Sequence, residues 1–259
     1  MCIRDSAKAA GEKIRISGGG RCNFTNLYTS PENFISQNPH FVKSALARYS
    51  QWDFIDWVAQ SGIAYHEKAL GQLFCDISAK EIISMLKIAI DNAGGKILLN
   101  TSVQNVEAIR HGYRLNLNSL GGQTTLTTYN LVVACGGKPI PKMGATDFGL
   151  KVAGQFGIKS VSFKPGLVPF TFNQKDIDKY FKGLSGLSID VAISCNHTSF
   201  RESMLVTHKG LSGPSILQIS SYWKKGDPIK INLLPDLDGV KYLVNMQKLR
   251  GKALLKTIL

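Results

Sequence analysis

The most informative part of this chain is residues 17–26, which read Ser-Gly-Gly-Gly-Arg-Cys-Asn-Phe-Thr-Asn. Three consecutive glycines give a backbone without Cβ atoms, which can adopt positive φ and lie flat against a ligand. The Arg, Asn and Thr that follow supply a cation, an amide and a hydroxyl, and all three can hydrogen-bond a polar cofactor. The alternative is a plain turn with a solvated arginine, since glycine clusters first of all mark turns.

Further motifs follow in a fixed order along the chain. They are Gly71-Gln72-Leu73-Phe74, Val132-Val133-Ala134-Cys135-Gly136-Gly137, Gly144-Ala145-Thr146-Asp147-Phe148-Gly149, Gly166-Leu167-Val168-Pro169-Phe170 and Thr207-His208-Lys209-Gly210-Leu211-Ser212-Gly213-Pro214. With residues 17–26 they cover nearly the whole chain. By these motifs the chain resembles the YhiN/BaiN-type flavoproteins, a family of FAD-dependent, NAD(P)-linked oxidoreductases that includes aminoacetone oxidase-like proteins.

The resemblance implies an α/β fold: an FAD/NAD(P)-binding Rossmann-like domain with a β-meander, plus an inserted mixed α+β domain rich in short strands. We assign residues 7–159 to the FAD-binding domain and residues 160–259 to the inserted, substrate-side domain. In the family, an N-terminal βαβ unit holds the FAD pyrophosphate and ribose, and a C-terminal segment returns to the FAD domain. Both are expected to be missing here, so we expect a fragment that is inactive and binds FAD poorly by itself. Residues 1–6 resemble translated adapter sequence and are excluded from the fold prediction.

Composition is that of an ordinary globular protein, with 44% hydrophobic and 19% charged residues. No apolar stretch reaches the roughly 18 residues of a membrane span, and no signal peptide is visible, so we expect a cytoplasmic protein without membrane partners. The 5 histidines have no metal-ligand spacing. The cysteines are odd in number and widely spaced, which argues against a disulfide framework and against a zinc site. They are Cys2, Cys22, Cys75, Cys135 and Cys195.

The formal net charge is +13, which raises the possibility of nucleic-acid binding. The basic residues are nevertheless dispersed, with no run longer than Lys224-Lys225. We therefore expect a small-molecule substrate and no specific nucleic acid. Two alternatives remain: a basic nucleic-acid-binding protein on a flavoprotein fold, and a cofactor-free scaffold.

Periodicity and capping residues predict the elements before residue 100. Residues 39–50 and 51–61 are predicted helices, the second ending at Gly62. Ser78 and Glu81 form a predicted capping box that opens a helix ending at residues 94–95. A short buried strand is expected at residues 97–99, in the helix-then-strand order of a parallel sheet.

The following region changes to alternating apolar residues. Residues 103–128 predict a three-stranded antiparallel meander with turns at residues 111–112 and 121–122. The continuous apolar run 131–135 predicts a strand buried on both faces. Thr146 or Asp147 is the expected N-cap of a helix that closes at Gly157. Beyond residue 160, strands at 187–195, 204–206 and 229–234 surround a helix at 214–222 with Pro214 at its first position, and a last helix is expected to include Leu259.

The resemblance implies a cofactor-binding set in which residues 17–25 lie against FAD and the residues after the 131–135 strand reach the carboxyl edge of the sheet. No catalytic acid or base and no metal ligand is assigned. The predicted set consists of Ser17, Gly18, Gly19, Gly20, Arg21, Cys22, Asn23, Thr25, Val103, Ala134, Gly136, Gly137 and Asp147.

Several of these residues have a competing interpretation. Arg21 could pair with a phosphate, an anionic substrate or reduced flavin, or form a surface salt bridge. Cys22 could be a redox thiol, but a packed thiol is favoured. Val103 could mark the strand whose backbone reads adenine, and is also expected in the core. Asp147 is first of all a helix cap, although the resemblance also implies cofactor contact.

Two serines raise the possibility of a hydrolase and are set aside. Ser185 and Ser212 are each followed directly by glycine, so neither lies in a G-x-S-x-G motif, and no strand is expected to lead into them. Ser212 is interpreted as a helix cap, and His208 either lines the substrate cleft or satisfies a buried hydrogen bond. The expected chemistry is hydride transfer from NAD(P)H through FAD to an organic acceptor whose identity no residue reveals.

Overall fold

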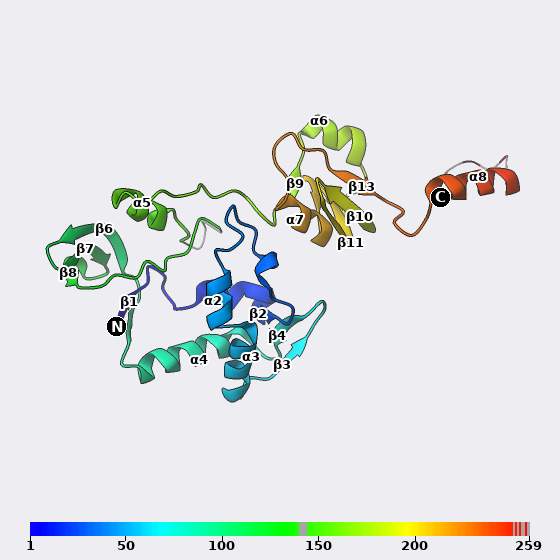
Figure 1. The fold of residues 1–259 in the computed structure, drawn as a ribbon. Coiled ribbons are helices and arrows are strands. Elements are labelled where there is room, and N and C mark those ends of the chain that lie inside the picture. Colours follow the sequence, from blue (N-terminus) through cyan, green and yellow to red (C-terminus); the bar gives the residue numbers. More distant parts are fainter. Residues whose placement is uncertain (140–143, 251, 253, 255–256, 258–259) are drawn as a thin grey trace. The chain divides into compact units, whose positions relative to one another are not determined.

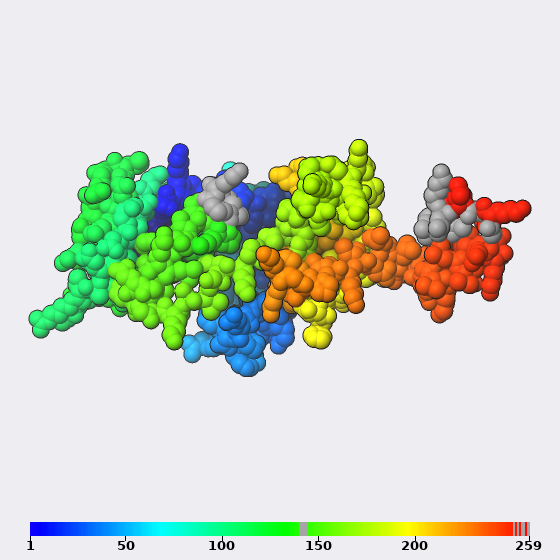
Figure 2. All heavy atoms as spheres, turned by 90° about the horizontal axis from the view of Figure 1, so that it is seen from above, coloured from blue at the N-terminus to red at the C-terminus, as the bar shows by residue number. Residues whose placement is uncertain are grey.

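The computed structural model describes residues 1–139, 144–250, 252, 254 and 257. The chain forms two compact units, Met1–Phe163 and Lys164–Leu259. Figure 1 shows their elements, and Figure 2 shows their heavy atoms in the same blue-to-red order of residue number. The division falls close to the boundary assigned between residues 159 and 160. The cofactor and substrate roles of the two units remain predictions.

A three-stranded antiparallel sheet organises the first part of unit 1. It contains β2 (Asn23–Asn26), β3 (Tyr65–Glu67) and β4 (Gln72–Cys75) in the order β2-β4-β3. Helices α3 (Gln51–Gln60) and α4 (Ala79–Asn92) supply apolar residues to the same core. Both lie beside this sheet in Figure 1. The core consists of Cys22, Val58, Ile63, Cys75, Ala79, Ile82 and Met85.

Local capping chemistry sets the limits of these helices. The Ser50 hydroxyl accepts a hydrogen bond from Asp53 N and opens α3, and Gly62 follows its end with a φ of 70°. Ser78 and Glu81 form the predicted capping box of α4. The first predicted helix is shorter than expected, since α2 spans only Lys43–Arg48, and a 3-10 turn occupies Pro31–Asn33.

Two predictions about the edge strands were wrong. Residues 1–6 take part in the fold, because β1 (Cys2–Arg4) pairs in parallel with β5 (Lys96–Leu98). Main-chain hydrogen bonds make this pairing, so the adapter-like side chains do not prevent it. The strand at 97–99 is not buried either, since Leu98 is 46% exposed. A sheet of two strands leaves these side chains largely uncovered.

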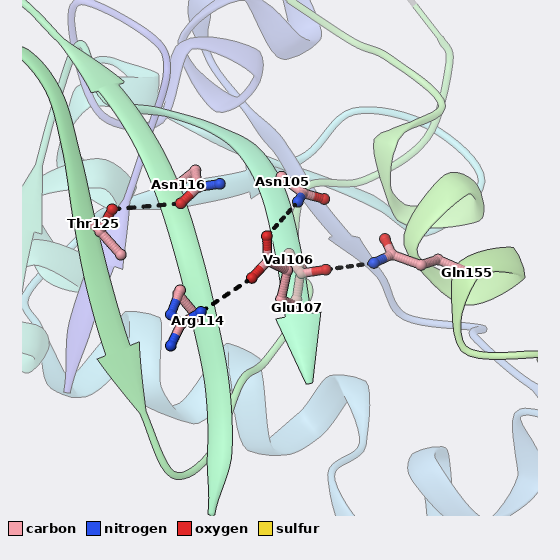
Figure 3. A network of polar contacts seen from close by, with 7 residues as sticks. All are labelled: Asn105, Val106, Glu107, Arg114, Asn116, Thr125 and Gln155. Carbon is pink, nitrogen blue, oxygen red and sulfur yellow. Dashed lines mark hydrogen bonds and ion pairs between the residues drawn. The ribbon is translucent and has the colours of Figure 1, made fainter. Parts of the chain in front are cut away.

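The predicted meander is confirmed. It consists of β6 (Ser102–Ile109), β7 (Gly112–Ser119) and β8 (Gly122–Thr128), joined in sequence by two-residue turns. Helix α5 (Phe148–Gln155) packs on it through Val152, and the Gln155 side chain donates a hydrogen bond to Val106 O (Figure 3). On the polar side of the strands, Arg114 pairs with Glu107 at 3.4 Å.

The predicted buried strand at residues 131–135 was wrong. Residues 131–137 have no regular secondary structure, Val132 is 80% exposed and Val133 is 45% exposed. A central strand needs hydrogen-bonded neighbours on both sides before its apolar side chains are covered. Among the described residues no strand pairs with this run. Hydrophobicity alone therefore does not bury it.

Unit 2 contains a five-stranded antiparallel sheet with the order β13-β10-β11-β12-β9. Helix α7 (Pro214–Ser220) packs on it, with Pro214 in its first turn as predicted. The core includes Val191, Ile193, Ile216 and Ile219, all 0% exposed. The strands are β9 (Phe170–Thr171), β10 (Ser188–Cys195), β11 (Thr198–Thr207), β12 (Gly210–Ser212) and β13 (Lys230–Asn232).

The three predicted strands of unit 2 are confirmed as β10, β11 and β13, with β11 longer than the expected 204–206. Short helical turns at Gln174–Asp176 (α6) and Ile177–Phe181 lie between β9 and β10 in the chain, and α8 (Gly239–Leu249) follows β13. Leu259, where a helix was expected, lies outside the described residues. In the described part of the chain, no helix has both the length and the apolar character of a membrane span.

Candidate functional site

The glycine loop, Ser17–Gly20, follows directly on the short helix α1 (Glu12–Ile16). The Ser17 hydroxyl donates to Ile14 O at 2.9 Å, so it closes the end of α1. The φ angles of Gly18, Gly19 and Gly20 are 57°, 68° and 89°. Residues with a Cβ rarely adopt this left-handed region, so the loop conformation depends on three glycines in a row.

The three glycines have different surroundings. A Cβ on Gly18 would lie 2.7 Å from the Phe74 ring and 2.8 Å from Asn23 N, so Gly18 is packed. A Cβ on Gly19 would meet nothing within 4 Å. The loop is therefore fixed on one side by Phe74 and presents bare main chain on the other. Such a surface can accept a flat ring in direct contact with the backbone.

Two polar side chains after the loop differ in their contacts: that of Arg21 is free among the described residues, and that of Asn23 is hydrogen-bonded. Arg21 is exposed, and within the described residues its guanidinium makes no ion pair or hydrogen bond, so the salt-bridge alternative was wrong. Asn23, oriented to satisfy its amide, donates to Thr25 O at 3.1 Å and Leu73 O at 3.3 Å. This bridges the irregularity in the β2–β4 register, so the Asn23 amide holds the sheet. Thr25 is half-buried.

Cys22 confirms the packed-thiol interpretation. It is 5% exposed and contributes to the same core cluster as Cys75. Burial raises the pKa of Cys75 to about 11, and the nearby Cys22 and Glu81 add to the shift. A thiol that stays protonated is a poor nucleophile. No motif indicates that these two cysteines share a core, and both are free thiols.

A second group of predicted residues lies on and around residues 134–138. Ala134 is exposed, and Gly136 has a φ of 70°. A Cβ on Gly136 would lie 3.6 Å from Lys13 Nζ, so this segment passes the helix that leads into the glycine loop. A Cβ on Gly137 would lie 2.8 Å from the Phe163 ring. Gly136 thus lies near a side chain of α1 and Gly137 lies against Phe163, but the two glycines do not end a strand as predicted.

Asp147 is the residue before α5, yet its side chain does not cap the helix. Thr146 Oγ1 accepts from Phe148 N at 3.3 Å instead. The Asp147 carboxylate pairs with Lys151 at 3.1 Å and Lys138 at 3.6 Å. The hydrogen bond from Lys151 and the charges of both lysines lower the pKa of Asp147.

Val103 lies in β6 opposite Leu117 and packs against the meander core, as the core interpretation predicted. The meander cluster does not include the glycine loop. Whether the Val103 backbone binds adenine stays a prediction.

Sequence reasoning missed a polar pair beside the glycine loop. Asn23, Phe74 and His66 occupy one cross-strand row of β2, β4 and β3. The His66 ring is stacked on Phe74, with centroids 6.3 Å apart and planes 20° apart, and its Nδ1 lies 2.6 Å from Asp76 Oδ1. Lys68 Nζ lies 5.3 Å from the Phe74 ring centroid. Only the strand register brings these residues together, and no motif signals it.

The serine and histidine candidates of unit 2 occupy different positions from those expected. Ser212 is a strand residue of β12, so a strand does lead to it, and Gly213 is the residue before α7. The helix-cap interpretation of Ser212 was wrong because the chain needs Gly213, with a φ of 94°, to turn from strand to helix. His208 is exposed, which contradicts a buried hydrogen bond. Within the described residues, no three His, Cys, Asp or Glu side chains gather as metal ligands.

Comparison with known families identifies the class of this chain. Residues 1–221 match the HI0933-like protein Rossmann domain, and the chain belongs to that family. This confirms the resemblance to the YhiN/BaiN-type flavoproteins and the Rossmann-like α/β fold. The structure adds that this fold includes several small sheets, with β1–β5 as the parallel pair among the described strands.

Three proteins with established names are similar in sequence to this chain. The chain is 47% identical over 261 residues to a protein of Haemophilus influenzae, and 46% identical over 260 residues to one of Escherichia coli, both named ribosomal RNA dihydrouridine synthase. Each match covers 100% of this chain and 64% of the relative. A 3-dehydro-bile acid delta(4,6)-reductase of Clostridium scindens is 24% identical over 250 residues, which is 91% of this chain and 58% of that protein. The chain thus spans less than two thirds of the length of these relatives.

Proposed function

We propose that this chain functions in a flavin-dependent reductase that uses FAD and NAD(P)H and adds hydrogen to an organic acceptor. The observation that carries the proposal is the left-handed glycine loop, held by Phe74 on one side and open at Gly19 on the other. The loop fits a flavin because no side chain on its open side, at Gly19, would keep a flat ring away from the main chain. When bound, FAD would accept a hydride from NAD(P)H and deliver it to the acceptor.

The residues of the chain would supply position and charge. The glycine loop would hold the flat face of the cofactor against main chain, and Phe74 would keep the loop rigid. The Arg21 guanidinium, exposed and without an intramolecular partner among the described residues, would neutralise a phosphate or negative charge on the reduced cofactor. Gly136 would approach from the segment that passes Lys13. These roles extend the predicted cofactor-binding set.

For the acceptor we propose a uridine base in RNA. The support is the name of the two relatives at 47% and 46% identity, since dihydrouridine is uridine with two added hydrogens. The formal net charge of +13 favours association with a polyanion. This proposal departs from our sequence-based expectation of a small-molecule substrate without specific nucleic acid.

A small unsaturated acceptor is the second candidate. The 24% identical relative is named as a reductase of a bile acid derivative, so the same framework can serve a free molecule in that protein. The exposed Arg21 would then face an anionic group of the acceptor rather than an RNA phosphate.

Turnover with both acceptors tests the proposal. The full-length protein, purified with FAD, is incubated with NAD(P)H and ribosomal RNA, and dihydrouridine is measured by mass spectrometry together with NAD(P)H oxidation. We expect NAD(P)H consumption that depends on RNA and equals the dihydrouridine formed. Consumption that depends instead on an unsaturated steroid-type acid would favour the second candidate. RNA binding without any turnover would contradict both and favour a nucleic-acid-binding protein.

A further inference from the structure

Unit 2 carries lysines around an exposed tyrosine, and the proposed function does not yet use them. Lys175, Lys179 and Lys182 belong to the segment 174–182, which consists of α6, the helical turn Ile177–Phe181 and the residue after it. All three lysines are exposed, and in the described part of the chain none of them forms an ion pair. Like charges four residues apart on a helix weaken it slightly. Stability of the fold therefore does not explain Lys175 and Lys179.

The two carboxylates of this segment are held by amide side chains and not by the lysines. Asp176 Oδ2 accepts a hydrogen bond from Asn173 Nδ2 at 2.7 Å, and Asp178 Oδ1 accepts one from Gln174 Nε2 at 2.9 Å. These carboxylates reduce the local charge, but they leave the lysine ammonium groups without a partner. The ammonium groups are therefore available to an anion from outside the chain, such as a phosphate.

Tyr180 lies among these lysines in the sequence and is 58% exposed. Lys179 Nζ lies over the Tyr180 ring, 4.7 Å from its centroid. No aromatic ring of the described residues stacks on Tyr180, so the other face of the ring is left for a flat partner. Proteins that bind single-stranded nucleic acids combine cations along the phosphates with aromatic side chains on which bases stack. Tyr180 and its neighbouring lysines provide both.

Contacts between strands bring further positive charge to this segment. Phe172 N donates a hydrogen bond to Lys209 O at 3.1 Å, and the Phe172 ring lies 5.2 Å from the Phe181 ring. The turn between β11 and β12 therefore adjoins the segment 174–182, and Lys209 in this turn is exposed. These residues are far apart in the sequence, so no run of basic residues signals them. The α6 surface is defined here as Lys175, Lys179, Tyr180, Lys182 and Lys209.

We propose that the α6 surface binds single-stranded RNA, with one base stacked on Tyr180 and phosphates held by the lysines. The choice of RNA as the partner rests on the proposed function. An acidic protein would pair with the lysines but has no base to stack on Tyr180. Double-stranded RNA does not fit either, because its bases are already stacked on one another. The α6 surface would hold the RNA and take no part in the reduction itself.

The test of stacking compares Tyr180→Ala with Tyr129→Ala in the full-length protein purified with FAD. Tyr129 is an exposed tyrosine of unit 1, so it controls for loss of a surface ring. The probe is a fluorescein-labelled oligouridylate of about 12 nucleotides, titrated by fluorescence anisotropy. We expect Tyr180→Ala to weaken binding at least about fivefold, and Tyr180→Phe and Tyr129→Ala to stay within about twofold of the unmodified protein. Flavin content, measured by visible absorbance, should be the same in all of them.

The test of charge compares two pairs of substitutions in the same protein. One variant carries Lys175→Gln and Lys179→Gln, and the control carries Lys224→Gln and Lys225→Gln, which removes two exposed lysines elsewhere in unit 2. Oligouridylate binding is measured over a series of salt concentrations. We expect the first variant to reduce the slope of log affinity against log salt by about 1.4, since it loses two phosphate contacts to a single strand. The control should leave the slope nearly unchanged.

Equal affinities of Tyr180→Ala and Tyr129→Ala would overturn the proposal. Equal losses from the two lysine pairs would do so too, because dispersed charge would then explain the binding. Polyglutamate that displaces the probe as well as unlabelled oligouridylate does would assign the surface to an acidic protein and also overturn the proposal. Dihydrouridine formation that is unaffected in Tyr180→Ala, with unchanged RNA affinity, would remove the surface and keep the proposed function. Binding through Tyr180 without any dihydrouridine would support the surface and defeat the proposed function.

Discussion

The sheet β2-β4-β3 and the run 131–137 were both expected to border the same cofactor, yet only the sheet is built as a rigid surface. In the sheet, Leu73 and Cys75 are buried, Cys75 in one core with residues of α3 and α4, and the Phe74 ring packs against the glycine loop. Residues 131–137 are equally apolar in their first half, but they have no regular secondary structure, and Val132 and Val133 are exposed. The strands of the sheet β2-β4-β3 are paired with one another, whereas residues 131–137 pair with no described strand.

The difference shows that apolar character is a weaker determinant than pairing. Leu73 is 2% exposed and lies in a strand that β2 and β3 flank on both sides. Val132 is as apolar as a buried strand residue, but among the described residues no strand pairs with its segment on either side. A rigid cofactor surface therefore depends first on the strands beside it.

Replacing one apolar residue of each region tests this contrast with the largest expected effect. Leu73→Ala should lower the free energy of unfolding by about 2–5 kcal/mol, because it leaves a cavity in a packed core. Val132→Ala should change it by no more than about 0.5 kcal/mol, as an exposed substitution does. Urea denaturation followed by circular dichroism measures both. Equal losses would show that residues 131–137 are packed in solution.

Substitutions within the glycine loop sharpen the comparison. Gly18→Ala should destabilise by about 2–4 kcal/mol, since it adds a left-handed alanine and a clash with the Phe74 ring and Asn23 N. Gly19→Ala has the backbone cost alone, about 1–2 kcal/mol, because the added methyl meets open space. Thermal unfolding of the two variants gives the difference. If Gly19→Ala were the more harmful, the packing of the loop on Phe74 would be wrong.

The buried thiol of the sheet predicts a smaller effect that depends on pH. The pKa of Cys75 is raised in the folded protein to about 11 from an ordinary 9.0, so the folded state holds this proton more tightly than the unfolded state. Stability from this group is complete below pH 9.0, falls as the pH rises toward about 11, and changes no further above it. Cys75→Ala should flatten this decline in the urea midpoint. Cys135→Ala, at an exposed thiol, should leave it unchanged.

The ion pairs of Asp147 should give the smallest effect. Lys151 and Lys138 lower the pKa of this carboxylate, so its contribution exists above the ordinary pKa of 3.8 and is lost as the pH falls through the lowered value. Because the pairs are exposed, salt screens them. Asp147→Asn should shift the unfolding midpoint slightly at neutral pH and low salt, and not at all in high salt. A large, salt-independent shift would indicate a buried role for Asp147.

The features predicted well from sequence were those set by local chemistry. The capping box at Ser78, the glycine after α3 at Gly62, the meander turns and Pro214 at the start of α7 all depend on residues close in the chain. The positive φ angles of Gly18 to Gly20 are of the same kind. Each of these signals needs only its own neighbours to form.

Features that depend on distant partners were missed or wrong. The 131–135 strand failed because pairing, not composition, decides burial. His66 and Asp76 went unnoticed because only the register of β3 with β4 places the imidazole on Phe74 and within 2.6 Å of the carboxylate. Ser212 was assigned to a cap because β12 is too short to be recognised in the sequence.

FAD affinity of Gly19→Leu against Gly62→Leu tests the central claim most directly. The two glycines have φ angles of 68° and 70°, and a Cβ on either meets nothing within 4 Å, so both substitutions carry the same backbone cost. FAD binding is titrated by flavin absorbance and fluorescence in the full-length protein stripped of its cofactor. We predict that Gly19→Leu weakens FAD binding at least about tenfold while Gly62→Leu leaves it within about twofold. Equal affinities would contradict a flavin lying on the glycine loop.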